Sequence, residues 1–89
     1  MNTILIVDGY NMIGAWKELK VLKDQNLEEA RDRLLERMAE YKAAMGWRVI
    51  VVFDAYHVPG VEKAYVQNAV EVIFTRKNET ADERIEKLT

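Results

Sequence analysis

An apolar run that ends in an acidic turn lies near the start of the sequence, where residues 3–11 read TILIVDGYN. A second run, residues 49–54, reads VIVVFD, and a third, residues 70–75, reads VEVIFT and precedes the acidic segment 79–83, ETADE. Continuous apolar runs of this length are typical of strands that are buried on both faces of a parallel sheet. In open α/β sheets, ligands bind beyond the carboxyl ends of the strands. The recurrence of acidic residues at that edge predicts a divalent metal site.

The composition is that of one globular domain. The chain has 89 residues, of which 49% are hydrophobic and 31% charged, so intrinsic disorder is not expected. There is no cysteine, which leaves oxygen ligands and the single His57 to bind a metal. The formal charge of −2 predicts that any RNA contact comes from a local patch. The first apolar run is short and lacks a basic leader, so we expect a cytoplasmic protein without a signal peptide or membrane span.

Residues 27–45 are predicted to form the main helix. Asn26 is a suitable N-cap, with Glu29 placed for a capping box, and Gly46 is placed to end the helix. The order strand, helix, strand over residues 3–54 predicts a right-handed crossover and hence a parallel sheet. Apolar residues recur every three or four positions and predict a buried stripe formed by Leu27, Ala30, Leu34, Met38, Tyr41 and Met45.

The other segments are interpreted from local signals. Residues 10–25 show no single period and are interpreted as a loop with one short helical turn, and residues 61–68 as a short helix or an irregular crossing. Residues 80–83, TADE, have the spacing of a capping box and predict a second helix. Three parallel strands with one full helix leave strand faces and an edge uncovered. We therefore expect further chain, a partner chain or exchange of elements between two copies to complete the core.

Four polar residues near the strand ends are the candidates for a site. In the functional interpretation, Asp8 binds Mg²⁺ or Mn²⁺ and Asn11 binds a water, a phosphate or the metal, whereas in the alternative both only satisfy turn amides. Asp54 is interpreted as a ligand or an electrostatic partner, or else as a turn residue that ends its strand. Asp82 is either a ligand or an acid that stabilises the first turn of a helix.

Basic and aromatic residues near the same edge are candidates for binding RNA phosphates and bases. The alternative is that they belong to an ordinary surface. No glycine-rich phosphate motif follows the first strand, so a nucleotide cofactor is not expected. His57, beside a Pro-Gly turn, fits a surface position better than acid-base catalysis. The RNA-binding candidates are Tyr10, Lys63, Arg76 and Lys77.

Residues 4–13, 51–55, 74–75 and 79–82 together resemble the YacP-like branch of the NYN domains, which are relatives of the PIN nucleases. This resemblance implies a PIN-like (Rossmann-like) three-layer α/β fold with a parallel sheet over residues 1–89. It also implies an endoribonuclease that depends on Mg²⁺ or Mn²⁺ and, in some bacterial members, acts on messenger RNA at the ribosome. Carried over by motif, Asp8 and Asp82 would be the metal-binding acids of catalysis, supported by Asn11, with Asp54 as a further ligand.

Members of that family usually continue through another strand, which ends in a Thr-Ser-Asp-like motif and supplies a further acid. We therefore expect residues 1–89 to be the N-terminal portion of such a domain. Two other functions stay open: a module that binds RNA or the ribosome without cutting, and a phosphatase-like or receiver-like domain. The absence of a second acid immediately after Asp8 argues against the latter, and metal-dependent RNA cleavage would distinguish the former from a nuclease.

Overall fold

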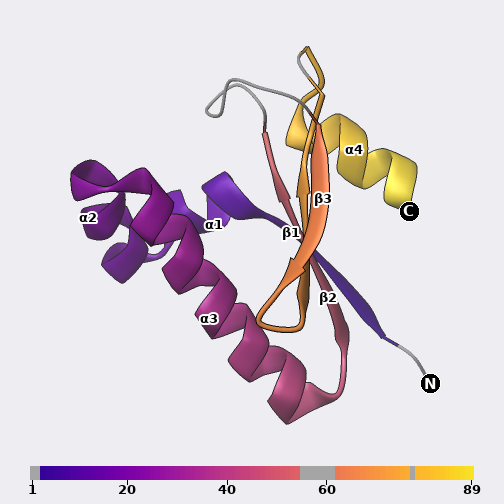
Figure 1. The fold of residues 1–89 in the computed structure, drawn as a ribbon, viewed down its shortest axis with the longest axis horizontal. Coiled ribbons are helices and arrows are strands. Elements are labelled where there is room, and N and C mark those ends of the chain that lie inside the picture. Colours follow the sequence, from indigo (N-terminus) through magenta and orange to yellow (C-terminus); the bar gives the residue numbers. More distant parts are fainter. Residues whose placement is uncertain (1–2, 55–61, 77) are drawn as a thin grey trace.

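The protein folds into a four-stranded sheet with helices on both of its faces (Figure 1). The structure is a computed structural model that describes residues 3–54, 62–76 and 78–89. The predicted turn at residues 56–60, including His57, and the RNA-binding candidate Lys77 lie outside these ranges. The strands are β1 (Ile4–Asp8), β2 (Arg48–Phe53), β3 (Lys63–Gln67) and β4 (Val70–Phe74), and the helices are α1 (Gly9–Ala15), α2 (Lys17–Gln25), α3 (Leu27–Met45) and α4 (Ala81–Leu88).

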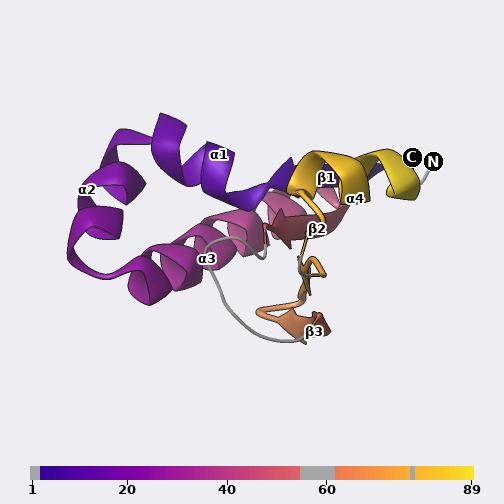
Figure 2. The same ribbon diagram turned by 90° about the horizontal axis from the view of Figure 1, so that it is seen from above.

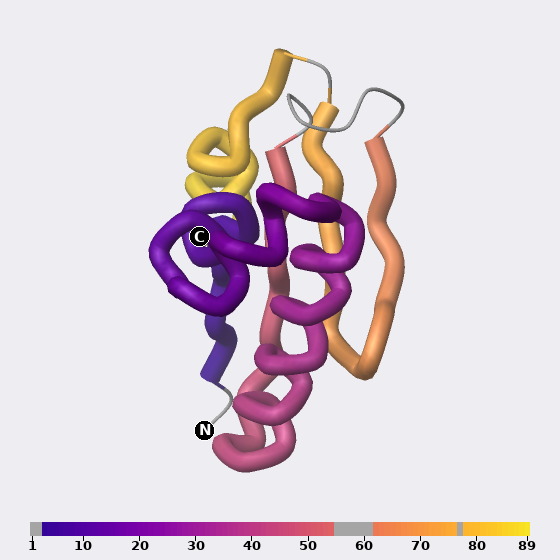
Figure 3. The backbone as a smooth tube through the Cα atoms, turned by 90° about the vertical axis from the view of Figure 1, so that its left-hand side faces the viewer, coloured from indigo at the N-terminus to yellow at the C-terminus, as the bar shows by residue number. Residues whose placement is uncertain are grey.

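The strands lie side by side in the order β1-β2-β4-β3 (Figure 3). β2 pairs in parallel with β1 and with β4, with Ile6 opposite Ile50 and Val51 opposite Val72. The three apolar runs of the sequence are therefore parallel neighbours, and their carboxyl ends meet at one edge of the sheet. β3 pairs antiparallel with β4, so the sheet is mixed and the prediction of a wholly parallel sheet was wrong in this strand.

Two helical layers enclose the sheet, which confirms the three-layer α/β fold class (Figure 2). α1 and α3 cover one face, where Val49, Val51 and Phe53 belong to the larger apolar core, and α2 packs on these two helices. α4 covers the other face, where Ile50 and Val52 pack with the start of that helix. Because successive residues of β2 point to opposite faces, burial on both faces requires a continuous apolar run rather than an alternating one.

α3 has the predicted bounds, and three of the six residues of the predicted stripe are buried, while Leu27 is partly buried. Asn26 accepts a hydrogen bond from the Glu29 backbone N–H at 3.1 Å, and Gly46 ends the helix with a φ of +69°. Ala30, Leu34 and Met38 are buried, and so is Leu35, which was not predicted. The last turns differ from the prediction, because the described chain leaves Tyr41 and Met45 each 51% exposed. None of the helices in the described ranges combines the length and the hydropathy of a membrane-spanning segment.

The interpretation of residues 10–25 as a loop was wrong, because this segment forms α1 and α2. Trp16 separates the two helices with extended backbone angles, φ −94° and ψ 112°. The break leaves helices of 7 and 9 residues. Each is too short for an apolar period to be recognised when the segment is considered as one unit.

The interpretation of residues 61–68 was also wrong in the part that the structure describes, because β3 is a strand. Four of its five side chains are exposed, so it lacks the alternation that marks a half-buried strand. Its hairpin turn uses Asn68 and Ala69, with φ of 54° and 65°. These values suit a type I′ turn, but the glycine that usually signals such a turn is missing.

Candidate active site

A polar hollow of about 480 Å³ lies at the carboxyl ends of β1 and β2, beside the start of α4. The parallel strands bring the ends of the first two apolar runs to this edge, and the connection after β4 returns α4 to it. Asp8, Asn11, Asp54 and Asp82 all line the hollow, together with Tyr10 and the first residues of α4. The structure therefore places the four residues predicted as catalytic groups or ligands around a single space.

Asp8 is both the last residue of β1 and the N-cap of α1. Its Oδ1 accepts a hydrogen bond from the Asn11 backbone N–H at 3.2 Å. No hydrogen bond to its Oδ2 comes from any residue that the structure describes. The carboxylate thus satisfies a turn amide with one oxygen and leaves the other for a ligand, so the two interpretations of Asp8 are compatible.

Gly9 brings the start of α1 close to β2. A Cβ atom at this position would overlap the ring of Phe53. That ring is fully buried and lies between Tyr10, at 5.0 Å between ring centroids, and Phe74, at 5.2 Å. The close approach needs a residue without a side chain. It therefore fixes the position of the first residue of α1 and, with it, of its N-cap Asp8.

Asp54 joins the end of β2 to the start of α4. Its Oδ2 accepts a hydrogen bond from the Ala81 backbone N–H at 3.4 Å. Thr80 caps the same helix through the predicted capping box, in which its Oγ1 accepts from the Glu83 N–H and its own N–H donates to Glu83 Oε1, each at 3.2 Å. Asp82 is exposed in this first turn. The cap accounts for Glu83, while Asp82 is left at the rim of the hollow.

Glu79 has a different role from the other acids of its segment. Its side chain is 7% exposed and accepts hydrogen bonds from Arg84 Nη2 at 2.7 Å and Lys87 Nζ at 2.8 Å. These bonds, that from Arg84 foremost, lower the pKa of the Glu79 carboxyl to about 2. The Thr75 hydroxyl and the Arg76 backbone N–H also donate to Glu79, at 2.8 and 3.2 Å. Glu79 therefore fixes α4 to the end of β4 and does not line the hollow.

Of the residues predicted to bind RNA, Tyr10 is the one that lines the hollow within the described ranges. Its hydroxyl accepts a hydrogen bond from Arg31 Nη1 at 3.2 Å, and burial raises the pKa of Tyr10. Lys63 is exposed at the start of β3, and Arg76 is exposed and paired with Glu62 at 3.3 Å. Neither lines the hollow. Arg31 was missed, because nothing in its sequence context distinguishes it from the other arginines of α3.

An apolar groove of about 510 Å³ borders the hollow along β1. The two spaces share Asp8 and Asn11, so a segment that covered the groove would also border the site. β1 is an edge strand of the sheet. The groove is lined chiefly by large apolar and aromatic side chains, among them Met12, Trp16, Met38, Tyr41 and Trp47.

The donor atoms of the hollow are carboxylate and carboxamide oxygens, which suit Mg²⁺ or Mn²⁺. Across residues 3–54, 62–76 and 78–89, no three acidic or histidine side chains are grouped closely enough to hold an ion among them. Mg²⁺ commonly binds through one or two carboxylates and retains several water molecules. The hollow therefore fits a hydrated ion held by one or two aspartates better than an ion enclosed by protein ligands.

Comparisons with known proteins identify the family. A family model for the YacP-like NYN domain matches residues 5–89. The chain is 66% identical over 85 residues to YacP of Bacillus subtilis (strain 168), which covers 96% of this chain and 50% of that protein. The crystal structure of Rae1 (YacP) from Bacillus subtilis matches with a TM-score of 0.82 and 62% identity over 99% of this chain and 50% of that chain. A mutant form of Rae1 matches with a TM-score of 0.81.

The chain belongs to the YacP-like NYN domain family, as its strand-end motifs indicate. The fold is the PIN-like nuclease fold of that family, and the solved relatives share it. The chain spans about half the length of these relatives.

Proposed function

We propose that the chain carries the acidic site of an endoribonuclease that hydrolyses RNA phosphodiester bonds with the help of Mg²⁺ or Mn²⁺. The observation that supports this proposal is the placement of Asp8, Asn11, Asp54 and Asp82 around one hollow at the carboxyl ends of parallel strands. Membership of a family of PIN-like nucleases makes RNA the expected substrate.

In this proposal each polar group of the hollow has a distinct task. Asp8 and Asp82 would hold the ion, with Asp54 supporting them from the end of β2. A bound divalent ion activates water and offsets the charge that develops on a phosphate. The Asn11 carboxamide, which is exposed beside Asp8, can donate a hydrogen bond to a phosphate oxygen. Tyr10 is a neutral phenol at physiological pH, as tyrosine ordinarily is, and burial raises its pKa further.

We extend the proposal to messenger RNA on the ribosome as the setting, on the basis of family resemblance, and to the cytoplasm as the compartment. The groove beside β1 is the place where additional chain, or a second copy, would complete the core. Because it shares Asp8 and Asn11 with the hollow, the segment that covers it would complete the wall of the site. A test of activity therefore needs both this chain and a version extended to the length of its relatives.

The test is cleavage of a mixed RNA panel with Mn²⁺ or Mg²⁺ by both lengths of the protein. Asp8→Asn should abolish cleavage and leave the fold intact, because the amide keeps the size of the side chain but lacks the negative charge that holds a cation. Asp24→Asn is the matched control, since it makes the same change in charge at an exposed position of α2 that does not line the hollow. It should cleave like the parent.

Retained cleavage in Asp8→Asn would contradict the assignment of the site. The alternative function is an RNA- or ribosome-binding module that does not cut. One observation favours it: in the described parts of the chain, no three acidic or histidine side chains gather around one point. RNA binding without cleavage by either length, with the extended protein cooperatively folded, would establish that alternative.

A further inference from the structure

Arg31 differs from the other arginines in its partners. All fifteen acidic residues of the sequence lie in the described ranges, and none of them pairs with Arg31. The other arginines, by contrast, all form ion pairs with glutamates: Arg33, Arg37, Arg48, Arg76 and Arg84. A guanidinium that is not paired with a carboxylate can bind an external anion without first breaking a salt bridge.

Arg31 is held in place by aromatic side chains instead. Its Nη1 donates to the Tyr10 hydroxyl at 3.2 Å, and its Cζ lies 5.8 Å from the centroid of the Phe74 ring. Four rings follow one another in an aromatic row: Tyr10, Phe53, Phe74 and Tyr65. Tyr65, at its end, lies 6.2 Å from Phe74 between ring centroids and is 40% exposed. Tyr10 lines the acidic hollow and Arg31 itself does not, so these contacts hold the guanidinium one side chain away from the hollow, near an exposed ring.

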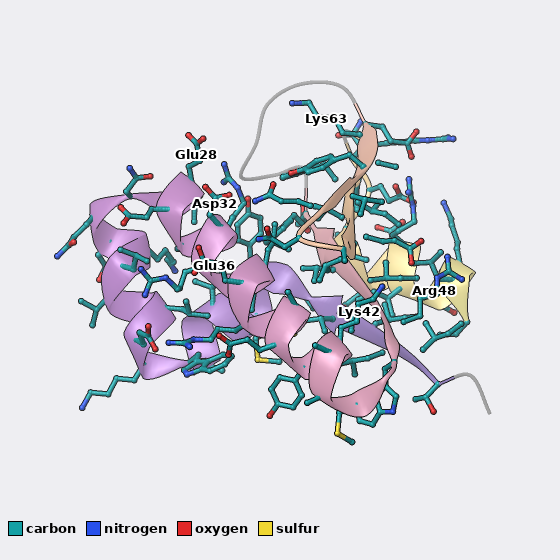
Figure 4. The ribbon with its side chains drawn as sticks, turned by 60° about the horizontal axis from the view of Figure 1, so that its bottom comes forward. Glu28, Asp32, Glu36, Lys42, Arg48 and Lys63 are labelled. Atoms are coloured by element: carbon teal, nitrogen blue, oxygen red, sulfur yellow. The ribbon has the colours of Figure 1, made fainter. Side chains whose placement is uncertain are left out.

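The charge on α3 limits the direction from which a polyanion can reach Arg31. Glu28, Asp32 and Glu36 follow one another along one side of this helix (Figure 4). They would repel a phosphate backbone laid along that side. Lys63, at the start of β3, is exposed and lies opposite Phe74 in the register of the sheet. Asp32 accepts a hydrogen bond from Gln67 Nε2 of β3 at 3.1 Å, on the side where Tyr65 lies. A phosphate therefore reaches Arg31 from the side of the hollow, and Tyr65 is left to contact the uncharged base.

We propose that Arg31 binds a backbone phosphate of single-stranded RNA next to the bond positioned in the hollow, and that Tyr65 stacks on the adjacent base. This inference rests on the proposed function, in that it takes RNA to be the ligand of the hollow. The guanidinium has five N–H donors in a planar fork, and its described hydrogen bond uses only Nη1. That geometry matches two oxygens of a phosphate, and an exposed tyrosine stacks on any base.

The test measures binding of a short fluorescent oligouridine in EDTA, where metal-dependent cleavage cannot occur, at several salt concentrations. Arg31→Gln should weaken binding about tenfold, as expected for the loss of a charged hydrogen bond. It should also lower the salt dependence of log K by about 0.7, the value of one contact to a single-stranded phosphate. Arg31→Lys, which keeps the charge but lacks the fork, should fall between the parent and Arg31→Gln.

Arg33→Gln is the matched control. It removes the same charge from the same helix, but at a position paired with Glu18 at 3.2 Å. Binding by Arg33→Gln should stay within about twofold of the parent, because a paired surface arginine contributes little to a remote contact. In the unmutated protein, the side-chain N–H signals of Arg31 should shift on addition of the RNA and those of Arg33 should not. This second measurement does not depend on the folding of a variant.

The outcomes separate this inference from the proposed function. Equal weakening by the two glutamine variants, unshifted Arg31 signals or a parent chain that does not bind RNA would overturn the role of Arg31. Unchanged affinity in Arg31→Gln with metal-dependent cleavage by the parent would leave the nuclease intact and remove Arg31 from it. Weakened binding in Arg31→Gln with no cleavage by any version would support Arg31 and overturn the nuclease.

Discussion

The amino end of the sheet and the hollow at its carboxyl end differ in how their charged side chains are partnered. At the amino end, Glu71 of β4 pairs with Arg48 of β2 through two bonds, at 2.5 and 2.7 Å, on the exposed surface. At the carboxyl end, neither Asp8 nor Asp82 pairs with a cation that the structure describes. These two aspartates of the hollow are held by helix starts instead, since Asp8 caps α1 and Asp82 lies in the first turn of α4. Glu79, at the same end but outside the hollow, does pair, with Arg84 and Lys87.

This difference indicates how a protein can keep acidic side chains close together without neutralising them. A helix start stabilises a nearby carboxylate through its backbone N–H groups by about 0.3–1 kcal/mol. A salt bridge would supply a competing cation, whereas a backbone amide leaves the net negative charge in place. The cations near α4, Arg84 and Lys87, are used by Glu79 on the other side of the connection. Asp8 and Asp82 thus have no cationic side chain among the described residues that would compete with an external ligand.

The largest expected effect concerns the contact that positions Asp8. Gly9→Ala should destabilise the protein by about 2–3 kcal/mol, because its Cβ would enter the space of the Phe53 ring, and overpacking of a closed core has this magnitude. The ring cannot move aside easily, since it is fully buried between two other rings. Urea unfolding monitored by circular dichroism would measure the change.

Gly14 provides the control within the same helix. A Cβ at Gly14 would meet nothing within 4 Å, so Gly14→Ala should stabilise the protein by about 0.5–1 kcal/mol through helix propensity alone. Equal effects of the two substitutions on the free energy of unfolding would contradict the close contact between Gly9 and the Phe53 ring.

The next effect compares the two ends of the sheet directly. Glu79→Gln should destabilise the protein by about 2 kcal/mol, because it weakens the hydrogen bonds from Arg84 and Lys87 to a carboxylate that is 7% exposed. Glu71→Gln is the matched change at the amino end, where the side chain is 34% exposed, and it should cost less than about 1 kcal/mol. Similar losses in urea unfolding would contradict a special role for Glu79.

The pH dependence gives a second measure of the same group. The pKa of Glu79 is lowered from 4.5 to about 2 in the folded state, so its contribution is present above about pH 4.5 and is lost as the pH falls toward 2. The stability difference between the parent and Glu79→Gln should therefore be full at pH 7 and close to zero at pH 2. A difference that persists unchanged at pH 2 would mean that the carboxylate charge is not what fixes α4.

Much of the site could be predicted from sequence, because β2 is buried on both faces, as predicted. The same prediction was wrong for β1, an edge strand in which only Val7 is buried. Burial of alternate residues against two helical layers made β2 a continuous apolar run, and parallel pairing placed Asp8 and Asp54 at one edge. The capping box at Thr80 then located the start of α4 and with it Asp82. Each of these signals is local or has a fixed period.

The parts that could not be predicted depend on contacts between distant segments. Arg31 and Arg33 are close in sequence and have the same chemistry, yet the first meets Tyr10 and the second meets Glu18. Which arginine stays free of a carboxylate is decided by the packing of α1 and α2 against α3, and no local pattern records it. The ion pairs of Glu79 likewise depend on how α4 is oriented relative to the end of β4, because its partners Arg84 and Lys87 belong to that helix.

The smallest expected effect tests the amino end of the sheet, where Ala69 closes the β3–β4 hairpin with a φ of 65°. A residue with a Cβ loses about 1–2 kcal/mol in this left-handed region, while glycine loses about 0.5–1 kcal/mol more entropy on folding. Ala69→Gly should therefore stabilise the protein by about 0.5–1 kcal/mol in urea unfolding. The hydrogen bond from Lys42 Nζ to the Ala69 carbonyl, at 2.8 Å, does not involve the side chain and should persist.

Asn68→Gly is the comparison for this turn, because asparagine tolerates the left-handed region better than alanine, so its replacement should gain less. Neither substitution should alter RNA binding, since the turn lies at the opposite end of β4 from the hollow. A change in RNA affinity from Ala69→Gly would show that the two ends of the sheet are coupled. In that case the Arg48–Glu71 pair at the amino end would also be expected to affect RNA binding at the hollow.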